Sequence, residues 1–130
     1  RVLCAAIRAY GRLSAEEAVA ALAAVIRANR RRDDGHEDMV CNAAVEVLSG
    51  LATPRATGIL SEELGRSEQK GWDLEYGSLL VKALSRIGTE EARARITAYA
   101  DRLSKRVPAD PVARAYWQKK IAEARAAARG

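Results

Sequence analysis

Residues 83–92 read ALSRIGTEEA, and this stretch decides how the chain is expected to fold. Gly88 predicts the end of a helix, because glycine readily takes the left-handed conformation that follows many last helical residues. Thr89 predicts the N-cap of the next helix, and Glu90 and Glu91 then fall in its first turn, where the helix dipole favours acids. The stretch therefore predicts a helical hairpin closed by a tight turn.

A second copy of this turn lies 36 residues upstream, where residues 47–56 read VLSGLATPRA. At that offset the flanking helices match at the spacings of three and four that a buried helical face requires. The matched pairs are Val45 with Val81, Leu48 with Leu84, Ser49 with Ser85, Leu51 with Ile87, Thr53 with Thr89, Ala56 with Ala92, and Leu60 with Ile96. Residues 1–30 fit the same pattern at an offset of 38, with Ile7, Tyr10, Leu13, Ala18, Leu22 and Ile26 on Val45, Leu48, Leu51, Ala56, Leu60 and Leu64. The chain is therefore predicted to repeat a two-helix unit.

Caps and breakers along the whole chain predict seven helices and no strand. The predicted helices cover approximately residues 2–10, 15–29, 36–51, 54–65, 72–87, 90–106 and 111–129. Because one such hairpin cannot bury its apolar stripe alone, we expect a single all-α domain, an α-solenoid of about three stacked antiparallel helix pairs plus a C-terminal helix. The pairs are residues 1–30, 36–65 and 72–106, and the helix at 110–129 either caps the stack or begins a further repeat. Since the chain begins at Arg1 without a methionine, we expect it to be a fragment of a longer one.

The turn at residues 83–92 resembles that of bacterial HEAT repeats, which read approximately A-L-G-x-I-G-D-P-E-A, and residues 47–56 look like the same element. Residues 38–44, DMVCNAA, are similar to the D-x-x-V-R-x-A-A start of the family's first helix, with a non-basic residue replacing its arginine. The resemblance covers about residues 1–106. Families with such repeats include scaffolds, transport factors, phycobilin-lyase-like proteins and DNA alkylation-repair glycosylases. The resemblance implies first helices along one face, second helices along the other, and a binding surface on the second-helix face.

Charge is unevenly distributed, with a net of −1 over residues 1–65 and +6 over residues 66–130. From Arg93 onward the chain has 10 basic and 3 acidic residues. This excess of positive charge fits an acidic protein partner, a phosphate backbone or simply a solvated face. The candidate binding residues are Arg27, Arg55, Trp72, Arg93, Arg95 and Arg102. We expect a protein-interaction or scaffold module. The alternatives are a nucleic-acid-binding or DNA-repair module that uses the basic C-terminal part, and a purely structural segment of a longer solenoid.

The remaining polar residues favour no chemistry. His36 is the single histidine and reads best as part of a polar loop that caps a helix, so no metal site is expected. Cys4 and Cys41 read as small buried side chains, although a disulfide stays open. Asp73 is interpreted as a helix cap and Asp101 as the partner of Lys105 four residues on.

No activated nucleophile or phosphate-binding glycine loop is evident, so we expect no enzyme and no cofactor. The sequence shows no signal peptide and no apolar run near the ~20 residues of a membrane span. We therefore expect no membrane span and a cytoplasmic location. The sequence does not indicate an oligomeric state.

Overall fold

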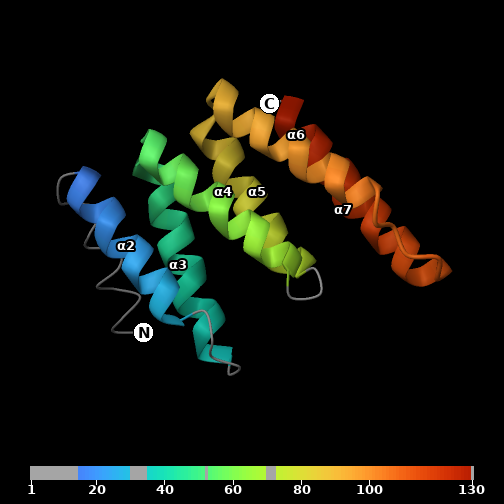
Figure 1. Ribbon diagram of the computed structural model, residues 1–130, viewed down its shortest axis with the longest axis horizontal. Coiled ribbons are helices and arrows are strands. Elements are labelled where there is room, and N and C mark those ends of the chain that lie inside the picture. The colour runs from blue at the N-terminus through green and yellow to red at the C-terminus, as the bar shows by residue number, and fades with distance from the viewer. Residues whose placement is uncertain (1–14, 30–34, 52, 70–72, 130) are drawn as a thin grey trace. The chain divides into compact units, whose positions relative to one another are not determined.

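The computed structural model describes residues 15–29, 35–51, 53–69 and 73–129 (Figure 1). These residues form six helices and, within the described ranges, no strand: α2 (Ala15–Asn29), α3 (Gly35–Leu51), α4 (Pro54–Gln69), α5 (Leu74–Ile87), α6 (Glu90–Ser104) and α7 (Pro111–Arg129). The prediction of an all-α chain is therefore confirmed. The predicted helix at residues 2–10 lies outside the described residues, as do Cys4 and Trp72.

The chain forms two compact units, Arg1–Leu60 and Ser61–Gly130, with the boundary inside α4. In the first unit α2 packs against α3. In the second unit α7 packs against both α5 and α6, and α5 also packs against α6. Each unit buries aliphatic side chains, such as Leu22 and Leu48 in the first and Leu84 and Leu103 in the second.

The helices begin where the sequence places their caps. Thr53 and Thr89 each accept a hydrogen bond at 3.1 Å from the backbone N–H three residues on. Asp73 and Asp110 do the same for α5 and α7 at 3.0 Å. Gly88 ends α5 with φ of 73°, the left-handed conformation that a side chain would disfavour. The hairpin predicted at residues 83–92 is thus present as two helices joined by a tight turn.

Five of the seven matched pairs of the predicted repeat have the same burial in both copies. The pairs Val45 with Val81, Leu48 with Leu84, Ala56 with Ala92, and Leu60 with Ile96 are buried at both members. Leu51 and Ile87, which precede the two turns, are half-buried in each case. Ser49 is buried where Ser85 is half-buried, and Thr53 is half-buried where Thr89 is exposed, so burial repeats at the apolar positions only.

The end of α4 was predicted wrongly. Gly65 does not stop the helix, which continues to Gln69, so the predicted loop at residues 66–71 is largely helical. A Cβ at Gly65 would meet no atom within 4 Å, so neither space nor backbone demands a glycine there. Leu64 and Ser67 are buried, and the Ser67 hydroxyl donates to the Leu64 carbonyl at 2.7 Å, so the next turn packs into the core. The following helix correspondingly begins at Leu74, two residues later than predicted.

Candidate binding surface on α7

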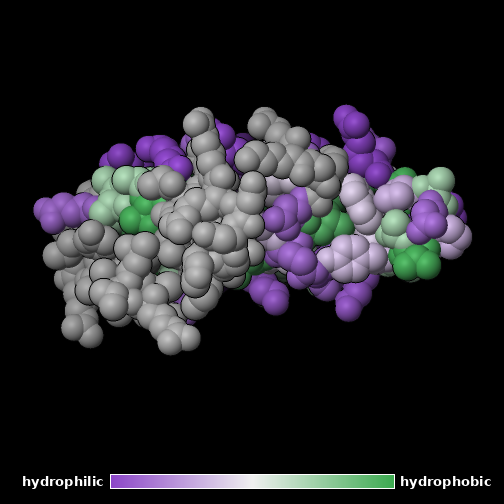
Figure 2. Space-filling model, turned by 90° about the horizontal axis from the view of Figure 1, so that it is seen from below, coloured by the Kyte–Doolittle hydropathy of each residue, from purple (hydrophilic) through white to green (hydrophobic). Residues whose placement is uncertain are grey.

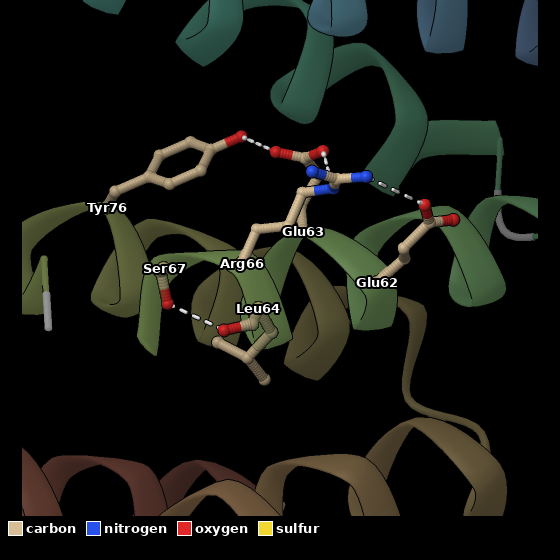
Figure 3. A network of polar contacts seen from close by, with 6 residues as sticks. All are labelled: Glu62, Glu63, Leu64, Arg66, Ser67 and Tyr76. Atoms are coloured by element: carbon tan, nitrogen blue, oxygen red, sulfur yellow. Dashed lines mark hydrogen bonds and ion pairs between the residues drawn. The ribbon is translucent and has the colours of Figure 1, made fainter. Parts of the chain in front are cut away.

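A buried carboxylate joins the second half of α4 to α5 (Figure 3). Glu63 is only 2% exposed and accepts a hydrogen bond from the Tyr76 hydroxyl at 3.1 Å. Arg66 lies 3.9 Å from Glu63 and 3.8 Å from Glu62, so it balances charge along the same helix. Buried carboxylates need such partners, because an unpaired one loses hydration without compensation. The arrangement gives Glu63 a structural role.

A second close contact joins Gly77, in the first turn of α5, to Tyr99 of α6. The Tyr99 side chain is 2% exposed, and its hydroxyl end lies against Gly77, where a Cβ would overlap it. Burial, together with the carboxylates of Glu68 and Asp73, raises the pKa of Tyr99 to about 12. Arg102 of α6 holds Glu68 with its Nε 2.6 Å from the carboxylate. These contacts fix α5 and α6 around the end of α4.

The exposed apolar residues lie on one side of α7. Among the described residues, Val112 at 80% and Tyr116 at 39% are the large hydrophobic side chains that remain exposed. They are one helical turn apart and therefore neighbours on the same flank. In Figure 2, apolar and hydrophilic surface lie side by side at the end of the view where Figure 1 has the turn from α6 to α7. We call Val112, Tyr116 and Lys119 the α7 flank.

The ring of Tyr116 is held in place by its neighbours. Its hydroxyl donates to the Glu75 carboxylate of α5. The Lys120 ammonium lies 5.4 Å from the ring centroid and 3.5 Å from Glu75. The hydrogen bond from Tyr116, together with Lys120, lowers the pKa of Glu75, and the same hydrogen bond raises the pKa of Tyr116 to about 12. These contacts hold the exposed aromatic ring in one orientation.

The predicted binding arginines divide between the two units. Arg27 at the end of α2 and Arg55 at the start of α4 are exposed in the first unit. Arg93, Arg95 and Arg102 are exposed on α6 in the second unit. Arg95 lies 3.9 Å from Glu91, and Arg102 pairs with Glu68 as described above. Trp72 lies outside the described residues, and the role of these six residues in binding stays a prediction.

Several basic side chains of the second unit are already paired with acids. Arg125 of α7 lies 3.1 Å from the Asp101 carboxylate, so the predicted pairing of Asp101 with Lys105 is wrong. α6 ends at Ser104, so Lys105 is the cap residue after the helix. The four-residue spacing that places side chains side by side within a helix therefore does not hold between Asp101 and Lys105. Lys120 pairs with Glu75 and Glu123. The positive charge of this region is therefore smaller at its surface than the sequence count implies.

The α7 flank was missed in the sequence, although a signal for it existed. Helical spacing puts Trp117, Ile121, Ala124 and Ala128 on one apolar stripe of the last helix, and these residues are buried or half-buried. Val112 and Tyr116 lie outside that stripe, and this position on the helix predicts that they are exposed. No sequence signal pairs Glu63 with Tyr76, because their contact joins two helices.

No further chemical site emerges from the described residues. Within these ranges, no three His, Cys, Asp or Glu side chains are grouped so that they could hold a metal ion. Of the described helices, none combines the length and apolar character needed to cross a membrane. No protein-family model, curated protein or solved structure matches the chain.

Proposed function

We propose that this chain is a non-enzymatic protein-interaction module of HEAT-like repeats that contacts its partner through the α7 flank. The observation that carries the proposal is the exposure of Val112 and Tyr116 one turn apart on α7, with the tyrosine ring already oriented. Tyrosine is frequent among the residues that dominate binding energy at interfaces. An aromatic that is ordered in the free protein loses less conformational entropy when it binds.

The repeat part of the proposal is supported by local environment. Thr53 and Thr89 cap their helices with the same hydrogen bond, and the residues that precede these caps by two, Leu51 and Ile87, are equally half-buried. Units that repeat in this way usually stack so that neighbours cover each other's apolar faces. A stacked scaffold that offers surface side chains to a partner is consistent with this pattern.

The alternative of nucleic-acid binding has less support. Arg95, Arg102, Lys120 and Arg125 each lie within 4.0 Å of a carboxylate, which reduces the charge available to phosphates. Phosphate contacts dominate affinity for nucleic acids and depend steeply on salt. A protein partner that contacts both an apolar and a charged surface accounts better for the α7 flank.

The proposal is tested by capture from a lysate of the protein's own cells. The immobilised chain is compared with Val112→Asp and with Lys82→Glu, an exposed change on α5 that serves as a control. We expect specific proteins that bind the unmodified chain and the control and are lost with Val112→Asp. Equal capture by all three chains would count against the α7 flank as a contact surface.

A parallel measurement addresses nucleic acid directly. Fluorescence anisotropy with a labelled random duplex is recorded between about 50 and 200 mM salt. We expect weak or no binding. Tight binding that falls steeply with salt, together with no protein captured, would replace the proposal by the nucleic-acid alternative.

A further inference from the structure

The outward side of α7 has the spacing of a helix-pairing seam. Six exposed residues follow one another at alternating intervals of three and four: Val112, Ala115, Lys119, Ala122, Ala126 and Arg129. This spacing keeps side chains on one line along a helix, as at the contact line of paired helices. We call these six residues the α7 seam. They continue the α7 flank along the whole helix.

The α7 seam combines one larger apolar side chain, Val112, with small side chains beside which a second helix can pack. Val112 is 80% exposed and has the exposed ring of Tyr116 four residues on. Beyond them, three alanines offer little bulk, and small residues let two helix axes approach closely. A helix lying along the seam would bury Val112 and part of the Tyr116 ring at one end. Its backbone could approach α7 over the rest.

The charges on the seam decide what kind of helix fits. Lys119 and Arg129 are exposed, and within the described part of the chain neither forms an ion pair. The nearby Glu123 lies 3.7 Å from Lys120 and is thus already paired. A second copy of α7 would bring two further cations to the seam and only one acid, Glu123, which is already paired, and like charges at an interface repel. A complementary partner carries carboxylates at these positions.

We propose that the α7 seam binds an amphipathic, acidic α-helix of a partner protein. The partner helix places aliphatic side chains against Val112 and Tyr116 and carboxylates beside Lys119 and Arg129. This inference rests on the proposed function and adds the chemistry of the partner to it.

The test uses three synthetic peptides and the complete chain. The first peptide has about three heptads with Leu along one seam and Glu on both flanks, which keeps it from pairing with itself. The second replaces each Glu by Lys, and the third keeps the Glu residues but replaces each Leu by Ser. Binding is measured by fluorescence anisotropy of labelled peptide. The protein variants are Val112→Asp, Lys119→Glu and the control Lys82→Glu, which makes the same charge change at an exposed position of α5.

We expect the acidic amphipathic peptide to bind at least about tenfold more tightly than the basic one, since opposite charges favour the encounter and like charges oppose it. Val112→Asp and Lys119→Glu should each weaken binding by about fivefold or more, and Lys82→Glu by less than about twofold. Binding of the serine peptide as tight as that of the leucine peptide would overturn the inference. So would a Lys82→Glu effect as large as that of Lys119→Glu.

The result separates this inference from the proposed function. If lysate capture depends on Val112 while no acidic peptide binds, the acidic-helix inference fails and the interaction module stands. If capture is insensitive to Val112 and no peptide binds, both fail. Dimerisation of the chain that Val112→Asp abolishes would show a second copy on the seam and would also overturn the acidic partner.

Discussion

Replacing Gly77 by alanine should destabilise the second unit, although alanine usually stabilises a helix. Gly77 lies inside α5 and is buried. A Cβ there would overlap the Tyr99 hydroxyl and lie 3.0 Å from the Tyr99 Cζ, closer than side chains normally approach. Tyr99 itself is 2% exposed and packs from α6, so its ring has little room to move. The new methyl group therefore has to displace packed structure.

The magnitude follows from two opposing effects. In a helix interior, alanine is favoured over glycine by about 1 kcal/mol. Forcing a methyl group into a filled site costs about 1 to 3 kcal/mol. Because the overlap here involves a buried ring, we expect the cost to exceed the gain, with Gly77→Ala lowering the free energy of unfolding by up to about 2 kcal/mol. Gly65→Ala is the matched control, since a Cβ at Gly65 meets no atom within 4 Å, and it should stabilise α4.

Urea titration followed by tryptophan fluorescence measures this effect. Both tryptophans, Trp72 and Trp117, belong to the second unit, so the signal reports on the part of the chain that contains Gly77. In a double-mutant cycle, Tyr99→Phe removes the hydroxyl and should recover part of the loss, with a coupling of about 1 kcal/mol or more. The reasoning is refuted if Gly77→Ala stabilises the protein as much as Gly65→Ala does. It is refuted equally if the two sites show no coupling.

Four further changes test other contacts by urea titration. The titration is followed by far-ultraviolet circular dichroism, because Thr53 belongs to the first unit and both tryptophans belong to the second. Thr53→Ala and Thr89→Ala should each lower the free energy of unfolding by about 1 kcal/mol, because both hydroxyls cap a helix in the same way. Serine at either position should restore most of that free energy. A serine that restores it at one position and not at the other would contradict the equivalence of the two caps. Tyr76→Phe should cost about 1 to 2 kcal/mol, since it removes a donor from the buried Glu63 carboxylate, and no loss would contradict the bond. The raised pKa of Tyr99, about 12, stabilises the fold below pH ~10, and this contribution is lost as the pH rises towards 12. Tyr99→Phe should therefore lose less stability over that range than the unmodified chain, and an identical loss would rule out this role.

Local signals in the sequence predicted the local structure correctly. Thr89 and Gly88 each act within one turn of their own helix, so a cap residue or a left-handed glycine is enough to place a boundary. The same applies to Asp73 and Asp110, which cap α5 and α7 as single residues before their helices. Burial of the repeated positions was also predictable, because helical spacing alone puts them on one face.

Contacts between helices were not predictable in the same way. Gly65 looked like a helix end, yet the packing of Leu64 and Ser67 outweighs the small cost of a glycine inside α4. Asp101 pairs with Arg125 across two helices, which four-residue spacing within one helix does not reveal. In each case the deciding interaction joins residues from different turns or helices, and its geometry exists only once the chain has folded.

The side of α7 that packs against α5 and α6 differs from its outward side in the contacts of its charged side chains. Lys120 and Arg125 point towards α5 and α6, where Glu75 and Asp101 meet them, and these pairs help to fix the rotation of α7. Although α7 is the longest helix described, Ala124 is its one fully buried residue. The stripe of Trp117, Ile121 and Ala128, which is half-buried, sets which side of α7 packs inward, and the ion pairs and the Tyr116 contact add to this preference. Val112 and Lys119 are therefore exposed on a helix of fixed rotation, which would lower the entropy cost of the helix binding proposed above.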